Sequence, residues 1–177
     1  MNGADELKKY IRPGMGTLIL GGVLIAIGVC VAVSVSIGAG LIMLALALLC
    51  NIGTIIELSR WSDTLKIFEQ SGLMDEAVAN FNAAIPHLDG ELLLGEKYLF
   101  GKRSGLILSY NEIRNAHQYI HKTNFAEDSR KLRVVLTSGK SIDLCKLKVR
   151  GKSDDALKAA LVAMIEKNGA MTIGYGR

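Results

Sequence analysis

Two of the chain's histidines, together with one of its cysteines, form the first candidate set of metal ligands. His117 and His121 are four positions apart, so in a strand both side chains lie on the same face, and Cys145 stands alone. A zinc site needs four ligands, and no CxxC pair, helical HxxxH motif or carboxylate group completes a set around these three. We therefore expect the histidines to lie on a solvated strand face, with no bound metal and no cofactor.

Catalytic motifs are the second source of chemistry to consider. The sequence contains no GxSxG motif, no Walker loop and no GxGxxG motif after a strand. The glycine-rich segment 95–105 precedes no helix, so it cannot offer a phosphate the amide groups of a helix start. We expect no catalytic residues and a protein that is not an enzyme.

Positive charge is the chemical feature that remains. Residues 97–152 carry 13 Lys or Arg against four Asp or Glu, a net charge of +9. One cluster lies in a short turn, and the other lies along a strand whose alternation directs its basic side chains to one outward face. The candidate lipid- or anion-binding residues are Lys102, Arg103, Lys146, Lys148, Arg150 and Lys152.

Two interpretations of this charge stay open. The basic residues could attract anionic lipid headgroups, at about 1 kcal/mol per residue near a membrane. They could instead form a solvated face that offsets residues 57–96, which carry a net charge of −6, and we favour this second interpretation. Nucleic acid is not expected as a partner, because the aromatic residues do not interleave with the basic ones as a stacking surface requires.

A long block without charged side chains precedes these charged segments of the chain. The 44 residues between Arg12 and Glu57 contain no charged side chain. About 20 apolar residues cross a bilayer as a helix, so the block is long enough for two spans. We expect helices at about 16–33 and 41–56, joined by the small and polar residues 34–40. The length of the block and its second span disfavour a cleaved signal peptide, and the lack of other structure to cover it disfavours a buried soluble hairpin.

Flanking charges set the expected orientation of this hairpin. Basic residues precede the first helix and follow the second, and the turn between the helices carries none. The positive-inside rule then predicts a multi-pass protein of the cell (inner or plasma) membrane with both termini in the cytoplasm. Small residues on the two helices would allow close packing and, with the opposite charges of the soluble segments, favour a homo-oligomer. The alternative is that glycine is simply common in membrane helices, and both interpretations stay open. The small residues are Gly21, Gly22, Gly28, Ala45 and Ala47.

Helical periodicity continues beyond the apolar block. An apolar stripe at steps of three and four residues predicts that the second membrane helix runs on to about Ser71, where Gly72 ends it. A shorter helix is expected at about 74–84, before Pro86. A last amphipathic helix is expected at 153–168, with an apolar side that covers a sheet.

Between these helices the pattern changes to period two, which predicts antiparallel strands. The expected hairpins join 97–100 to 105–109 and 130–137 to 141–149, and 113–122 forms a further strand. In the last strand the apolar phase changes at Leu144 and Cys145, which indicates a bulge or bend.

The order of these elements resembles a pleckstrin-homology-like (PH-like) domain. Residues 96–101 and 106–113, the turn at 137–140 and the tail at 172–176 resemble those of bacterial two-span membrane proteins with a cytoplasmic PH-like domain, over about residues 92–176. The resemblance implies a fold and a location, and no catalytic residues. In the PH superfamily the first hairpin loop is where phosphoinositides bind, but here the loop at 101–105 is too short to match the basic constellation of those binders.

The sequence thus predicts an α+β protein with four segments. They are a cytoplasmic segment at 1–15, a transmembrane helical hairpin at 16–56, an acidic helical linker at 57–90, and a PH-like antiparallel β-barrel or sandwich at 91–177 that a C-terminal amphipathic helix closes. The expected function is non-catalytic: protein interaction or self-association through the PH-like domain. The alternative function is peripheral sensing of anionic lipid headgroups by its basic face.

Overall fold

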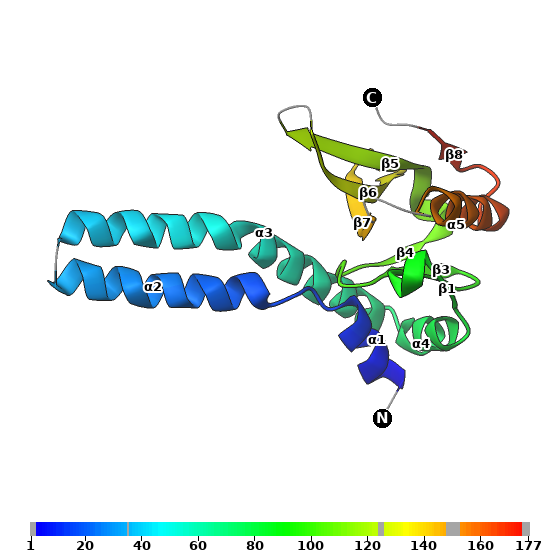
Figure 1. The fold of residues 1–177 in the computed structure, drawn as a ribbon. Helices are drawn as coiled ribbons and strands as arrows, with labels where there is room; N and C mark the ends of the chain where they lie inside the picture. Colours follow the sequence, from blue (N-terminus) through cyan, green and yellow to red (C-terminus); the bar gives the residue numbers. More distant parts are fainter. Residues whose placement is uncertain (1–2, 35, 124–125, 148–152, 175–177) are drawn as a thin grey trace. The chain divides into compact units, whose positions relative to one another are not determined.

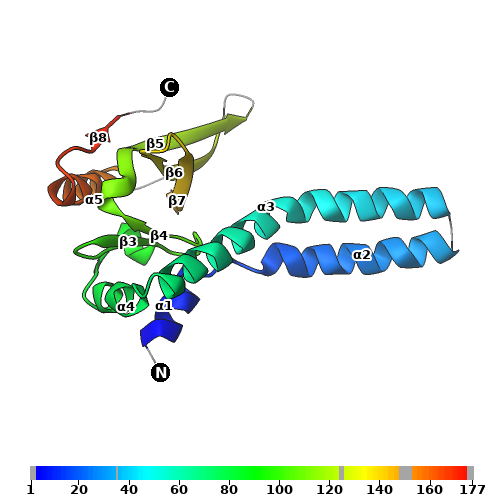
Figure 2. The same ribbon diagram turned by 180° about the vertical axis from the view of Figure 1, so that it is seen from behind.

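The computed structural model describes residues 3–34, 36–123, 126–147 and 153–174, and Figures 1 and 2 show its elements. The chain forms two compact units. Pro13–Arg60 is the hairpin unit, and Met1–Arg12 together with Trp61–Arg177 is the sheet unit. The protein is α+β, as predicted. The predicted N-terminal segment and linker, however, do not stand apart from the sheets, because both contribute helices to the sheet unit.

The hairpin unit consists of α2 (Gly16–Ser34) and the first part of α3 (Ile37–Gln70), which lie side by side in both views (Figures 1 and 2). Among the described residues, α3 is the one helix long and apolar enough to cross a membrane, and the apolar stretch of α2, Leu18–Ser34, is shorter. As predicted, α3 continues without a break beyond the apolar block and ends just before Gly72, whose φ is +70°. That α2 also crosses a membrane remains a prediction.

Small residues let α2 and α3 approach closely, as expected for some of the predicted positions. A β-carbon at Gly21 would overlap the amide of Asn51, and one at Gly28 would lie 3.1 Å from the β-carbon of Met43. Ala47 is buried, whereas Gly22 and Ala45 face outward. The interface therefore uses one face of α2, and Gly22 is not part of it.

The sheet unit contains two four-stranded sheets. Sheet A has the strand order β1-β2-β3-β4 and is antiparallel throughout. Its strands are β1 (Ile85–His87), β2 (Leu92–Leu94), β3 (Tyr98–Gly101) and β4 (Ile107–Ser109). Sheet B has the order β7-β6-β5-β8, and only β8 is parallel to its neighbour. Its strands are β5 (Ile113–Thr123), β6 (Ala126–Leu136), β7 (Ser141–Leu147) and β8 (Thr172–Ile173).

One core fills the space between the two sheets and α5 (Ser153–Lys167). Leu99 of sheet A, Leu132 of sheet B and Met164 of α5 are all fully buried in it. The amphipathic C-terminal helix therefore covers the sheets as predicted, within one residue of its predicted end.

A second core covers the opposite face of sheet A. It joins α1 (Gly3–Ile11), the end of α3 and α4 (Met74–Asn82) to the strands, and Leu7, Leu65 and Phe100 are among its buried residues. Because sheet A is covered on both faces, all four residues of β3 are buried and the strand lacks simple alternation. The sequence pattern predicted none of α1, β1 and β2, and Ile85, which follows the predicted helix, lies exposed in β1.

The predicted closed barrel is wrong for the part of the chain that the structure describes. Closure requires strand pairing between the sheets, and each sheet here pairs only within itself. The chain passes from β4 to β5 through the short helix η2 (Tyr110–Glu112), which a capping box from Ser109 and Glu112 stabilises. The Glu112 carbonyl also accepts a hydrogen bond from the Thr137 N–H, 2.8 Å away. These bonds lie where the chain passes from sheet A to sheet B, and the two separate sheets share one core.

The predicted irregularity in the last strand is confirmed. Leu132 pairs with Cys145, but the next residue, Arg133, pairs with Asp143. Leu144 is therefore an extra residue on β7, and both Leu144 and Cys145 are buried. The bulge restores the alternation beyond it, so that Lys146 is exposed.

Candidate functional site

A charged surface lies on the outer side of sheet B. On β6, Leu132 and Val134 enter the core, so their neighbours Lys131 and Arg133 point outward. The register pairs Arg133 with Asp143 and Lys131 with Lys146 on β7, and both β6 residues also pair with β5. We call this surface the outer face of sheet B; it consists of His117, Tyr119, Lys131, Arg133, Asp143 and Lys146.

One carboxylate on this face binds two cations. The Nε of Arg133 donates to Oδ1 of Asp143 over 2.6 Å, and Nζ of Lys131 donates to Oδ2 over 2.9 Å. Partial burial by itself would raise the pKa of Asp143, but these two hydrogen bonds outweigh it and hold the pKa below the usual value. The Arg133 guanidinium also lies 3.5 Å from the centre of the Tyr119 ring. Arg133 is therefore held in place from two sides.

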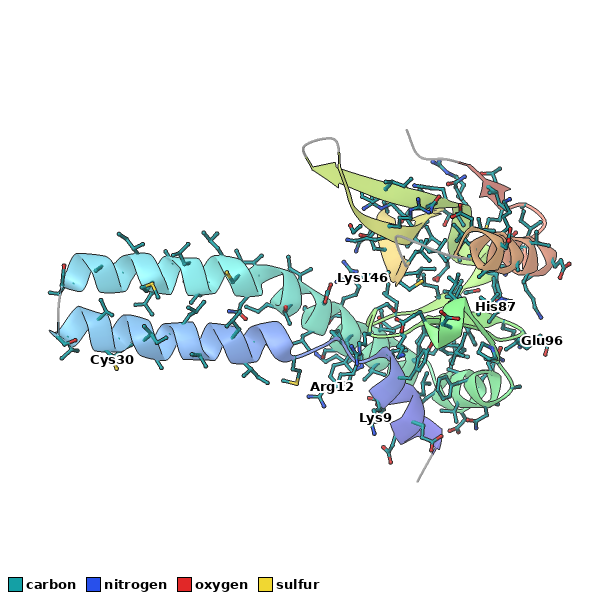
Figure 3. All side chains as sticks on the ribbon, in the orientation of Figure 1. Lys9, Arg12, Cys30, His87, Glu96 and Lys146 are labelled. Carbon is teal, nitrogen blue, oxygen red and sulfur yellow. The ribbon has the colours of Figure 1, made fainter. Side chains whose placement is uncertain are left out.

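The outer face of sheet B keeps an excess of positive charge. Lys131, Arg133 and Lys146 contribute three positive charges, and Asp143 contributes one negative charge. Lys146, labelled in Figure 3, is exposed and forms no ion pair with any described residue. With His117 neutral the face has a net charge of +2, which suits an anionic partner.

His117 is buried on this face, so the predicted solvated strand face is wrong for this residue. Only 8% of it is exposed, and its Nδ1 lies 2.8 Å from Oδ1 of Asn115. Burial, helped by the nearby Arg133, lowers the pKa of His117, so the ring is neutral at pH 7. Asn115 in turn donates to the backbone oxygen and the hydroxyl of Thr172. His117 therefore helps to hold β8, and the side chain of His121 lies outside the described residues.

Neither a metal site nor a reactive thiol forms around these groups in the described part of the chain. No three His, Cys, Asp or Glu side chains there lie close enough to share a metal ion. Cys145 faces the core, and burial raises the pKa of its thiol to about 12, so the thiol stays protonated at neutral pH.

The predicted basic turn between β3 and β4 serves a different purpose. Lys102 forms an ion pair with Glu91 at 2.9 Å, so the carboxylate offsets the positive charge of the lysine. The N–H groups of Arg103 and Gly105 donate to the carbonyl oxygens of Tyr10 and Ile11 at the end of α1. Both donors have left-handed backbones, with φ of 58° and 71°. The turn therefore caps α1, and only the side chain of Arg103 remains exposed.

The structure brings the two predicted basic clusters close together. A β-carbon on Gly101 would lie 2.6 Å from the carbonyl oxygen of Leu144, so the β3–β4 turn passes directly beside β7. Lys146 is two residues further along β7. The other predicted residues of that cluster, Lys148, Arg150 and Lys152, lie outside the described residues.

The acidic segment already has partners within the sheet unit. Glu69 pairs with Lys8 at 2.8 Å and Glu76 with Lys97 at 2.7 Å, in addition to the pair of Glu91 with Lys102. The expected compensation of the acidic linker by basic residues is thus seen for Lys97 and Lys102. On the outer face of sheet B, by contrast, Lys131 and Arg133 form their ion pairs with Asp143 and not with the acidic linker.

Sequence reasoning missed four residues of this face: Tyr119, Lys131, Arg133 and Asp143. The signal for the two basic residues was present, because they alternate with Leu132 and Val134 in a predicted strand. Their pairing with Asp143 depends on the bulge and on the cross-strand register, which alternation alone does not give.

Comparison of this chain with protein-family models, with curated proteins and with solved structures finds no match. The PH-like resemblance therefore remains a prediction, and the functional argument rests on the chain's own residues.

Proposed function

We propose that this protein is a non-catalytic, bacterial membrane protein whose cytoplasmic, PH-like sheet unit binds an acidic partner protein. In this proposal α2 and the first half of α3 both cross the cell membrane and anchor the sheet unit beside it. The outer face of sheet B is the binding surface.

The composition of the hairpin unit supports the membrane anchor. Large apolar side chains point outward along both helices (Figure 3), for example Ile19 at 69% exposure, Val33 at 85% and Leu49 at 66%. Apolar surface of this extent has no stabilising partner in water and is suited to lipid.

The sheet unit is built from segments before and after the apolar block, and this favours an even number of membrane crossings. Leu7 precedes the apolar block and Phe100 follows it, yet both lie in the same core. The chain must therefore return to the side of the membrane from which it left. If α3 crosses once, α2 must also cross.

The observation that carries the binding proposal is the fixed excess charge of the outer face of sheet B. Lys131 and Arg133 share a single carboxylate while Lys146 stands exposed, so the face is held in shape and remains positive. A preorganised basic surface steers an acidic partner and loses little entropy on binding.

A photocrosslinker on this face tests the proposal in native membranes. We expect p-benzoylphenylalanine at Ser141, an exposed residue of β7 beside the face, to give a discrete protein adduct. The same probe at Ala159, exposed on α5, is the matched control. The Ser141 adduct should be lost in the Lys146→Glu variant. Equal labelling from both positions, or an adduct that survives the charge reversal, would contradict the proposal. An adduct of twice the chain's mass identifies self-association.

Anionic lipid headgroups are the second candidate, favoured by the exposed cation at Lys146 near a membrane. The full chain in nanodiscs of neutral lipid distinguishes the two. Salt-sensitive binding of anionic vesicles that Lys146→Glu weakens, without a protein adduct at Ser141, supports the lipid function over the protein one.

A further inference from the structure

One side of β5 has a long stretch of backbone without a neighbouring strand. β6 pairs with β5 over almost its whole length, but on the other side β8 pairs only with Asn115 and Ala116 (Figure 1). The strand order places no further described strand beside β5, so from His117 onward this side is open. We call residues 117–121 the free edge of β5.

The backbone groups that face this edge follow from the hydrogen bond to the tail of β8. The Ala116 carbonyl accepts from the Gly174 N–H over 3.4 Å, so the backbone of Ala116 faces β8 and not β6. The register with β6 is regular over the free edge, so the direction alternates residue by residue. The N–H and C=O groups of Gln118 and Ile120 therefore point to the open side, where no described strand pairs with them.

The other open edges of the two sheets carry features that hinder the addition of a strand. β1 contains Pro86, which lacks an N–H group, and β7 has the bulge at Leu144 and the exposed Lys146. β4 and β8 have only three and two residues. The free edge of β5 contains no Pro, Gly, Lys, Arg, Asp or Glu, and it has no bulge. It is therefore the edge best suited to accept another strand.

The side chains beside the free edge fit an acidic strand. The Arg133 guanidinium lies 3.5 Å from the centre of the Tyr119 ring, so the positive charge of the outer face of sheet B reaches β5 itself. Neighbouring strands lie about 4.8 Å apart and every second side chain of a strand points to the same face, so Asp or Glu on an added strand comes close to Arg133. On the opposite face of β5, Ile120 is 37% exposed and offers an apolar contact.

We propose that the acidic partner binds as an added strand. An extended segment of the partner pairs with the backbone of the free edge of β5, in line with β8, and places Asp or Glu side chains on the outer face of sheet B. Its intervening apolar side chains cover Ile120. Backbone hydrogen bonds supply affinity in this mode of binding, and the alternation of side chains supplies specificity. The proposal specifies how the partner is held and therefore rests on the proposed function.

Proline at the free edge tests the backbone pairing. Ile120→Pro removes an N–H that faces the open side and leaves the hydrogen bonds to β6 intact, so the melting temperature of the sheet unit should change little. In native membranes we expect the yield of the Ser141 adduct to fall roughly tenfold, the effect of about one hydrogen bond. Ile120→Thr is the matched control, because it retains both the N–H and a β-branched side chain, and it should lower the yield far less.

A photocrosslinker at the edge identifies the occupant and needs no proline variant. p-Benzoylphenylalanine in place of Tyr119 should give an adduct with the same protein as the probe at Ser141. Mass spectrometry of the digested adduct should place the crosslink in a segment with Asp or Glu at alternating positions. An adduct of twice the chain's mass, or a crosslinked segment without acidic residues, would overturn the proposal.

The two proposals fail in different ways. A Ser141 adduct that is lost in Lys146→Glu but persists in Ile120→Pro would overturn strand addition and leave the proposed function intact. The absence of any Ser141 adduct in the parent protein would overturn the proposed function itself.

Discussion

Gly101 of β3 lies against the backbone of Leu144 in β7, so close that a β-carbon on Gly101 would come within 2.6 Å of the Leu144 carbonyl oxygen. The extra residue of the β7 bulge thus meets the last residue of β3, the one position of that strand without a side chain. This approach joins two sheets that share no strand pairing.

Substitution of Gly101 by alanine should therefore destabilise the sheet unit. We expect a loss of about 1–3 kcal/mol in the free energy of unfolding, because the backbone of β7 must move to admit the methyl group. Gly169→Ala is the control, since a β-carbon there has no neighbour within 4 Å and its backbone is not left-handed. Denaturant unfolding of the full chain in detergent, followed by the fluorescence of Trp61, gives both values. Equal stability of the two variants would show that the contact is not needed.

The packing of α5 gives a sharper pair of variants. Leu161 is 7% exposed and belongs to the core, whereas the adjacent Val162 is 53% exposed. Leu161→Asp should cost about 3–5 kcal/mol, because it places an unpaired carboxylate in the core. Val162→Asp should leave the melting temperature nearly unchanged. If both variants melt alike, α5 does not pack by the face described here.

Local patterns were sufficient to predict most elements of sheet B and α5. These elements bury one face each, and a single buried face leaves a periodic pattern in the sequence. The patterns are the alternation in β6 and β7, the phase change at Leu144 and the apolar stripe of α5. The same logic missed α1 and β1 and obscured sheet A. Sheet A is covered on both faces, so its strands do not alternate, and α1 is stabilised by residues about 90 positions away, such as Phe100. Partners this distant leave no periodic signal near α1.

The candidate site was predicted only in part, because local patterns do not show which distant residues come into contact. Lys102 and Lys146 were found from charge alone, but charge does not show that Glu91 neutralises Lys102. Lys131 and Arg133 become part of a surface only through the register that places Asp143 between them. Cross-strand neighbours of this kind depend on tertiary structure.

His117 should make the protein less stable as the pH falls. Its pKa is lowered in the folded state, so below about pH 6.5 the unfolded chain binds a proton that the folded chain resists. Stability present at pH 7 is then lost as the pH falls from 6.5 towards the lowered pKa. We expect His117→Gln to reduce this slope in denaturant unfolding between pH 5 and 8. Part of the slope should remain, since burial also lowers the pKa of His87. An unchanged slope would contradict a neutral, buried His117.

Asp143 should affect the stability of the protein at lower pH than His117 does. Its pKa is lowered, so its contribution to stability is present above the unfolded value of about 3.9 and is lost as the pH falls through the folded pKa. In Asp143→Asn this acid-range loss should shrink. The same change removes the one negative charge of the outer face of sheet B, so binding to an acidic partner should strengthen at low salt. Weaker binding by Asp143→Asn would mean that the arrangement of Arg133, and not net charge, governs recognition.

The membrane topology is the prediction on which the proposed function depends. Leu7 and Phe100 share a core although the apolar block lies between them, and residues 1–12 and 61–177 form one unit. If the apolar block crosses a membrane, we therefore expect both segments on the same side. Reporters fused before Met1 and after Arg177 should therefore both be active only in the cytoplasm, where the flanking basic residues favour retention. A cysteine in place of Ser36, between the two helices, should react with an impermeant thiol reagent from outside, in a background with Cys30 and Cys50 replaced by alanine. A single crossing by α3 alone predicts the opposite result, with the two reporters active on different sides. That result would also exclude the core that joins Leu7 to Phe100.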